Sequence, residues 1–213
     1  MNNWIKKINE IEPALASSIE LVEQAFSALL ESVSAGGKIL ICGNGGSAAD
    51  SEHIVGELMK GFHLKRPVSI QMREKLQQVY GGEEGAYLAN NLQGTIPAIS
   101  LVSHTSLITA FMNDVDASMV FAQQVLGYGK AGDCLLALST SGNSNNVVNA
   151  VKLAKVLGVK TIGLTGESGG KLAALCDVCV RVPSNSTPII QQYHQVVYHA
   201  LCAALEEALF ATL

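Results

Sequence analysis

Residues 38–47, KILICGNGGS, join a short apolar run to a glycine-rich turn and decide the expected fold. Residues 38–42 are predicted to form a buried strand, because they are a strand-length apolar run that ends at a glycine. The glycines that follow permit positive φ and a close approach of a ligand to the backbone. We expect Ser47 to cap the next helix and the free amides of the turn to face an anion.

The same alternation of apolar runs and helical patterns continues along the chain. Strands are predicted at residues 38–42, 97–102, 134–138, 160–165 and 177–182. Helical patterns occupy residues 2–34, with a break near Pro13, and residues 47–60, 118–126, 143–157 and 188–210. Such alternation indicates right-handed crossovers and a parallel sheet with helices on both faces. The expected fold class is α/β: a three-layer αβα sandwich with a five-stranded parallel sheet.

We expect a single domain over residues 1–213, with a helical segment at residues 1–34 and a C-terminal helix at residues 186–211. Residues 65–97 form a long connection between the first two strands. Residues 72–80 and 83–92 have helix-forming composition and are separated by two glycines, so this connection is predicted to be a helical excursion. Its role is open: it either covers a site or joins subunits.

Composition restricts the partners. Hydrophobic residues make up 48% of the 213 residues and charged residues only 15%, which indicates that apolar surface is buried between subunits. The net charge of −4 argues against a broad nucleic-acid-binding face. The N-terminus lacks the apolar core of a signal peptide, and no apolar run is long enough to span a membrane. We therefore expect a cytoplasmic oligomer.

Two further polar turns follow the third and fourth predicted strands. Residues 139–144, STSGNS, offer four hydroxyl groups and precede a helix, and residues 165–170 form another glycine-containing turn. Ligands of open α/β sheets bind at the carboxyl ends of the strands, where these turns meet the glycine turn. One such turn alone is ordinary strand-to-helix punctuation. Together, and without a P-loop or GxGxxG pattern, they favour a small phosphorylated ligand over a nucleotide.

Candidate chemical groups lie on two of the predicted helices. His53 and Glu57 are four residues apart on the helix after the glycine turn and share one face, although such a pair is also common on solvated surfaces. Gln191 and His199, on the last helix, are about 12 Å apart along a regular helix, which strains coordination of one ion unless one of them comes from a neighbouring subunit. For His194 we expect a hydrogen-bonded packing role.

These residues resemble the sugar isomerase (SIS) domain family, and within it the branch that isomerises heptose phosphates. The resemblance covers residues 36–206, apart from a segment near residues 73–95. It is carried by CGNGGSAAD at residues 42–50 with His53 and Glu57, by Asn113-Asp114, by STSGNS at residues 139–144, by LTG at residues 164–166, and by Gln191 with His199.

The resemblance implies a homotetramer with active sites between subunits, and one zinc ion per subunit held by His53, Glu57, Gln191 and His199. It implies interconversion of D-sedoheptulose 7-phosphate and D-glycero-D-manno-heptose 7-phosphate through an enediol, with Glu57 as base and His199 as acid. The implied substrate contacts are Asn44, Gly45, Gly46, Ser47, Asn113, Asp114, Ser139, Thr140, Ser141, Ser144 and Gln191.

Three features depart from the family pattern. Gly61 replaces a frequent arginine, Pro188 replaces a frequent aspartate, and the helical excursion is additional. The alternative function is a non-catalytic SIS module that binds a sugar phosphate or a protein partner such as the replication initiator DnaA. Because such a binder can dispense with Glu57 and His199, and both are present, the sequence favours the enzyme.

Overall fold

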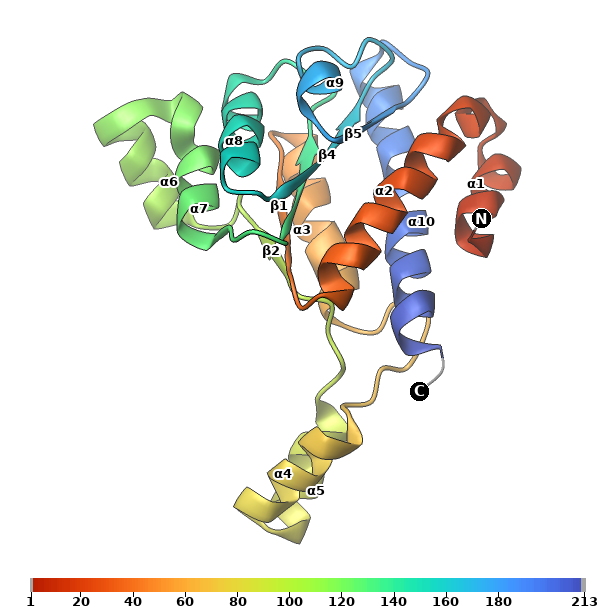
Figure 1. The fold of residues 1–213 in the computed structure, drawn as a ribbon, viewed down its shortest axis with the longest axis vertical. Coiled ribbons are helices and arrows are strands. Elements are labelled where there is room, and N and C mark those ends of the chain that lie inside the picture. The colour runs from red at the N-terminus through yellow and green to blue at the C-terminus, as the bar shows by residue number, and fades with distance from the viewer. Residues whose placement is uncertain (1, 212–213) are drawn as a thin grey trace.

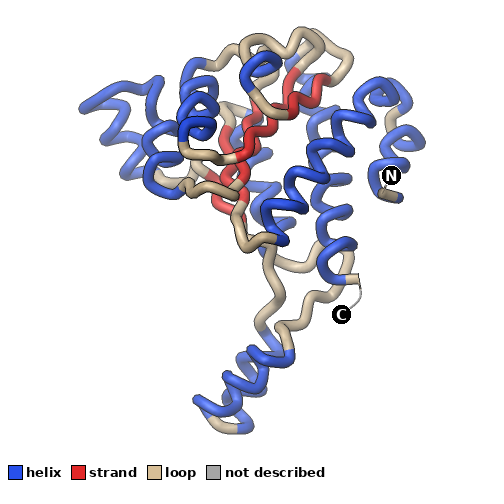
Figure 2. The backbone as a smooth tube through the Cα atoms, viewed as in Figure 1, coloured by secondary structure: helices blue, strands red, loops and turns tan. Residues whose placement is uncertain are grey.

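The computed structural model describes residues 2–211 and contains one five-stranded sheet covered by helices on both faces (Figures 1 and 2). All strand pairs are parallel and the strand order is β2-β1-β3-β4-β5. The strands are β1 (Ile39–Cys42), β2 (Ala98–Ser100), β3 (Cys134–Leu138), β4 (Lys160–Thr165) and β5 (Val178–Arg181). The predicted three-layer αβα sandwich with five parallel strands is confirmed.

Side chains of successive strand residues enter two separate cores. Ile39 and Ile41 of β1 point into the first core, and Leu40 and Cys42 point into the second, as the pleat requires. The first core lies under α1 (Asn3–Ile11), a 3₁₀ segment (Pro13–Ser18), α2 (Ile19–Ser34), α3 (Gly46–Met59) and α10 (Thr187–Phe210). The second lies under α7 (Val120–Tyr128), α8 (Asn145–Val156) and α9 (Leu172–Leu175).

The β1–β3 contact lies at the reversal of strand order, because the chain leaves β1 to form β2 on one side and returns to form β3 on the other. In open α/β sheets such a switch point opens a crevice at the carboxyl ends of the strands. The glycine turn after β1 and the serine-rich turn after β3 therefore lie at neighbouring strand ends. No helix within residues 2–211 is long and apolar enough to cross a membrane.

The helical excursion is a hairpin of α4 (Ile70–Tyr80) and α5 (Gly82–Asn91) that projects from the body (Figure 1). Its helices approach closely at Gly85, where a Cβ would lie 2.5 Å from the Leu76 carbonyl oxygen. Its stem is an antiparallel bridge between Pro67 and Gln93. The hairpin connects the end of a helix to the start of a strand, which places it at the amino edge of the sheet. It therefore does not cover the carboxyl edge of its own chain.

Between β2 and α7, the chain adds α6 (Thr105–Phe111), a π-helical segment (Met112–Asp116) and a 3₁₀ turn (Ala117–Met119). In Figure 1 α6 lies beyond α7, on the side of the molecule opposite α10. None of the described α6 residues is buried. The sequence prediction left this helix out, because α6 has no buried apolar face to impose a periodic pattern.

Candidate active site

The glycine turn after β1 is tight enough to start α3 without a side-chain cap. Gly45, with φ of 56°, is the N-cap residue, and its carbonyl accepts the amides of Ala48 at 3.0 Å and Ala49 at 3.2 Å. Ser47 lies buried inside the first turn, so its predicted capping role is wrong. The amides of Gly46 and Ser47 have no acceptor within residues 2–211. Together with the helix dipole, they form a site for an anion.

Gly46 also allows α10 to approach the start of α3. A Cβ at Gly46 would lie 2.3 Å from Gln191 Nε2, a distance that no side chain tolerates. The Gln191 amide is therefore held against the glycine turn. A glycine at this position serves close packing as well as ligand access.

The serine-rich turn lies beside the glycine turn and is joined to it. Asn44 and Asn146, at the start of α8, exchange two amide hydrogen bonds of 2.9 and 2.8 Å. Within the serine-rich turn, the hydroxyl oxygens of Ser139 and Ser144 are 3.0 Å apart. The Ser141 hydroxyl accepts the amide of Asn143 at 3.1 Å. The two predicted phosphate-binding turns thus form one continuous polar edge.

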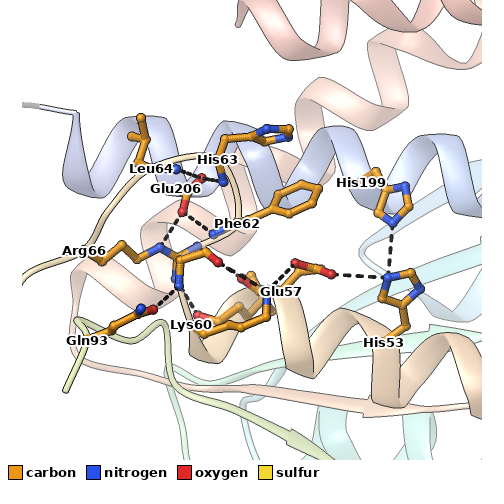
Figure 3. A network of polar contacts seen from close by, with 12 residues as sticks. His53, Glu57, Lys60, Phe62, His63, Leu64, Arg66, Gln93, His199 and Glu206 are labelled. Carbon is orange, nitrogen blue, oxygen red and sulfur yellow. Dashed lines mark hydrogen bonds and ion pairs between the residues drawn. The ribbon is translucent and has the colours of Figure 1, made fainter. Parts of the chain in front are cut away.

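His53 lies at the centre of a cluster between α3 and α10 (Figure 3). His53 Nε2 is 3.3 Å from Glu57 Oε1 and 3.5 Å from His199 Nε2. The side chain of Glu57 is only 14% exposed, whereas a solvated surface pair would leave both partners open to water. The structure thus brings together three residues that the sequence placed on two distant helices.

A tyrosine and an aspartate hold His53 from behind. The Tyr198 hydroxyl is 3.1 Å from His53 Nδ1 and 3.2 Å from Asp50 Oδ1. Burial raises the pKa of Asp50, although Tyr198 and His53 oppose that shift. Because Nδ1 is occupied by Tyr198, Nε2 is the nitrogen that faces Glu57 and His199. Sequence reasoning missed both supports, although Asp50 precedes His53 by three residues and Tyr198 adjoins His199.

Charge around the cluster is mixed. Burial, followed by the nearby His53, lowers the pKa of His199, which favours its neutral imidazole near pH 7. Lys60 Nζ lies 3.2 Å from Glu57 Oε2 and supplies a cation beside it. A side chain at Gly61 has no room in this conformation, because a Cβ would lie 2.5 Å from the Leu64 carbonyl oxygen. The cation beside Glu57 therefore comes from position 60.

The cluster has the donor chemistry of a zinc site. Two imidazole nitrogens and one carboxylate oxygen surround His53 Nε2, and zinc accepts these ligand types. The Tyr198 contact at Nδ1 is the kind of support that fixes the orientation of a metal-binding histidine. Within residues 2–211, however, no three His, Cys, Asp or Glu side chains form a complete metal-binding group. Gln191 lies at the glycine turn, so the four residues of the implied zinc set fit as three plus one.

Two of the predicted substrate residues lie apart from the cluster. Asn113 and Asp114 are exposed on the π-helical segment after α6, and the Asn113 amide donates to Asp114 Oδ1 at 2.8 Å. No hydrogen bond joins either of them to the cluster within residues 2–211. The single chain therefore does not bring them to His53.

His194 is buried as predicted, but its predicted hydrogen bonding is wrong. Neither ring nitrogen has a hydrogen-bond partner within residues 2–211, and burial lowers the pKa of His194 to about 4. The ring is therefore neutral and packs in the core beneath α10. Pro188 lies in the first turn of α10, where its missing amide costs nothing.

Comparisons with known proteins agree with this site. Models of the SIS domain match residues 99–207 and residues 3–78. A phosphoheptose isomerase from Aneurinibacillus thermoaerophilus is 38% identical, and the match covers 99% of this chain and 96% of that protein. A phosphoheptose isomerase from Rhodospirillum rubrum is 41% identical, with 95% of this chain and 90% of that protein covered.

Solved structures give the same result. The phosphoheptose isomerase from Neisseria gonorrhoeae superposes with a TM-score of 0.72 at 35% identity, covering 94% of this chain and 93% of the other. The structure from Francisella tularensis superposes with a TM-score of 0.72 at 30% identity, covering 97% of this chain and 100% of the other. The chain therefore belongs to the SIS domain family, in the group of the phosphoheptose isomerases.

Proposed function

We propose that this protein interconverts D-sedoheptulose 7-phosphate and D-glycero-D-manno-heptose 7-phosphate. The observation that carries the proposal is the His53–Glu57–His199 cluster, which lies beside two anion-binding turns at the switch point of the sheet. The similarity to phosphoheptose isomerases supports the same substrate class. Phosphate binding and proton transfer are thereby assigned to different parts of one crevice.

The phosphate would bind at the polar edge formed by the two turns. The free amides of Gly46 and Ser47 and the hydroxyls of Ser139 and Ser144 supply donors there. Glu57 is ten residues beyond Ser47, which is about 15 Å along the helix axis. Such a separation suits an extended open-chain sugar that holds its phosphate at one place and its reacting carbons at another.

The reaction needs a base that moves a proton between adjacent carbons. In our proposal, Glu57 removes a proton from C1 of the ketose, which leaves an enediol, and returns a proton to C2 to give the aldose. His199 exchanges the hydroxyl proton between the two oxygens. His53 orients both groups through its contacts at Nε2, and Lys60 favours the ionised form of Glu57.

His53, Glu57 and His199 would hold a zinc ion, with Gln191 as the fourth residue of the set. When bound, zinc would act as a Lewis acid that stabilises negative charge on the substrate oxygens. Since Gln191 packs against the glycine turn, its contribution in this arrangement is to orient substrate near the phosphate end.

We further propose a cytoplasmic homotetramer whose active sites lie between subunits. Exposed apolar side chains outside the crevice support burial against other copies; they include Met112, which is 49% exposed, and Val115, which is 66% exposed. These residues flank Asn113 and Asp114, so a neighbouring subunit is the source from which that pair would reach a crevice.

Product analysis tests the proposal. The purified protein is incubated with D-sedoheptulose 7-phosphate, and in parallel with other ketose phosphates, and the products are identified. The expected result is an aldose heptose 7-phosphate. A protein that binds the ketose phosphate without converting it would instead support the alternative of a non-catalytic sugar-phosphate sensor.

A further inference from the structure

A buried ion pair holds the loop that follows the helix carrying Glu57. Arg66 and Glu206 are each 1% exposed, and Arg66 Nε donates to Glu206 Oε1 at 2.7 Å (Figure 3). The same carboxylate accepts the backbone amides of Phe62 at 2.8 Å, His63 at 2.7 Å and Leu64 at 3.1 Å. Burial alone would raise the pKa of Glu206, but these donors outweigh it and lower the pKa. The carboxylate is therefore ionised and fully occupied.

Arg66 also completes the C-terminal end of α3. The last carbonyls of a helix have no acceptor role inside that helix and need outside donors. Arg66 Nη1 donates to the Leu58 carbonyl at 2.7 Å, and Nη2 donates to the Glu57 carbonyl at 3.1 Å. A cation at this end also interacts favourably with the helix dipole. The backbone of the proposed base is thus bound directly by Arg66.

The partner of Arg66 lies on the helix that carries the proposed acid. Glu206 is seven residues beyond His199 on α10, which is two turns, so the two residues share a face. That face contacts α3 twice: through His199 at His53, and through Glu206 and Arg66 at Glu57. The relative position of α3 and α10 near Glu57 therefore depends on the ion pair.

We propose that Arg66 and Glu206 are positioning residues for the isomerisation, which set the Glu57 carboxylate against His53 and His199. The inference rests on the proposed function for the role of Glu57 alone. A small displacement suffices to matter, because a misplacement of about 1 Å at a reacting group costs on the order of a hundredfold in rate.

Arginine is required at this position by its shape. Its planar fork donates to a carboxylate and to two carbonyls at once, whereas a lysine at the same place has a single compact ammonium. The variant Arg66→Lys therefore keeps the positive charge and loses the combined hold on Glu206, Leu58 and Glu57. Glu206→Gln keeps the side-chain shape and replaces an acceptor oxygen with a donor that faces backbone amides.

The matched control is the ion pair of Lys38 and Asp133, at the amino edge of the sheet, where Asp133 is 5% exposed at its side chain. Steady-state kinetics and thermal melting are compared for the wild type, Arg66→Lys, Glu206→Gln and Asp133→Asn, at a temperature at which all are folded. We expect kcat to fall about tenfold to a hundredfold in the Arg66 and Glu206 variants, with KM changed less than about threefold. Asp133→Asn should lower the melting temperature and leave kcat unchanged.

An unchanged kcat in folded Arg66→Lys would overturn the proposal, as would an equal fall of kcat in Asp133→Asn. If Glu206→Gln does not fold, Arg66→Lys decides. A crystal structure of Arg66→Lys gives a second readout that needs no substrate: the Glu57 Oε1 to His53 Nε2 distance should lengthen from 3.3 Å. An unchanged distance would overturn the proposal, whereas an inactive wild type would count against the proposed function instead.

Discussion

The two ends of the sheet treat their polar groups differently. At the amino edge, polar groups are paired within the chain: Asp133 accepts the Lys38 amide at 3.0 Å, the Lys130 amide at 2.9 Å and the Lys38 ammonium. The Ser32 hydroxyl donates to the Gly132 carbonyl at 2.7 Å. At the carboxyl edge, the amides of Gly46 and Ser47 have no acceptor within residues 2–211.

The difference separates stability from function along one set of strands. Polar groups that are satisfied within the fold contribute to the free energy of unfolding, and groups left unpaired are available to a ligand. Changes at the carboxyl edge should therefore alter turnover more than stability, and changes at the amino edge should do the reverse. The following substitutions test that division.

The largest effect on turnover is expected from Glu57→Gln. The amide cannot accept the proton, so kcat should fall about a hundredfold to ten-thousandfold, while the melting temperature stays near that of the wild type. The matched control is Glu52→Gln, on the same helix, whose carboxylate accepts only the exposed Ser103 hydroxyl at 2.7 Å. Turnover that survives Glu57→Gln would remove Glu57 from the role of base.

Metal removal should give the next largest effect. Dialysis against a chelator is expected to lower kcat about a hundredfold, with recovery when zinc is added, because a Lewis acid contributes several kcal/mol to such a reaction. Metal analysis should find zinc in the wild type and in His63→Ala, whose ring stacks on Trp4, and none in His53→Ala. Full turnover in metal-free protein would contradict a zinc site.

Ser144→Ala should weaken phosphate binding. The loss of one hydrogen bond to a charged group corresponds to about 2 kcal/mol, so kcat/KM should fall about thirtyfold, mainly through KM. Ser27→Ala is the control, because the Ser27 hydroxyl donates to the Glu23 carbonyl within α2, far from the polar edge. An unchanged KM for Ser144→Ala would exclude this hydroxyl from the phosphate site.

The smallest effect on turnover is expected from Asp133→Asn. Burial would raise the pKa of Asp133, but hydrogen bonds from Lys38 and Lys130 outweigh it and lower the pKa. A depressed carboxyl pKa stabilises the fold above the unfolded-state pKa of about 3.9, and this contribution is lost as the pH falls through the folded-state pKa. Denaturant unfolding should show the variant to be less stable at pH 7 by about 2 kcal/mol.

That stability difference should shrink below about pH 4 and disappear at lower pH, because the wild-type carboxyl is then protonated as well. A difference that does not change with pH would mean that the charge of Asp133 contributes nothing. A fall of kcat in this variant would break the division between the two ends of the sheet.

Much of the fold could be predicted from the sequence because the strands are continuous apolar runs. The predicted bounds of β3 and β4 agree with the structure, since both strands are paired on two sides and end at polar turns. The edge strand β2 was predicted too long, because only Ala98–Ser100 pairs with β1. The helical hairpin was predicted from composition and from its separating glycines, and it is confirmed.

The site was predicted only where it depends on local spacing. His53 and Glu57 follow from a four-residue interval on one helix. By contrast, Tyr198 meets Asp50 across 148 positions, and Arg66 meets Glu206 across 140. No periodic pattern in a single sequence connects such positions, because their contact is created by the packing of α10 on α3.

Gly46 has a consequence for how this sequence can change over generations. Its missing side chain is the space that the Gln191 amide occupies, so positions 46 and 191 are not free to vary independently. On this backbone, any side chain at position 46 excludes a glutamine at position 191. Substitutions at the glycine turn are therefore expected to appear together with a shorter residue on α10, and drift at one position constrains drift at the other.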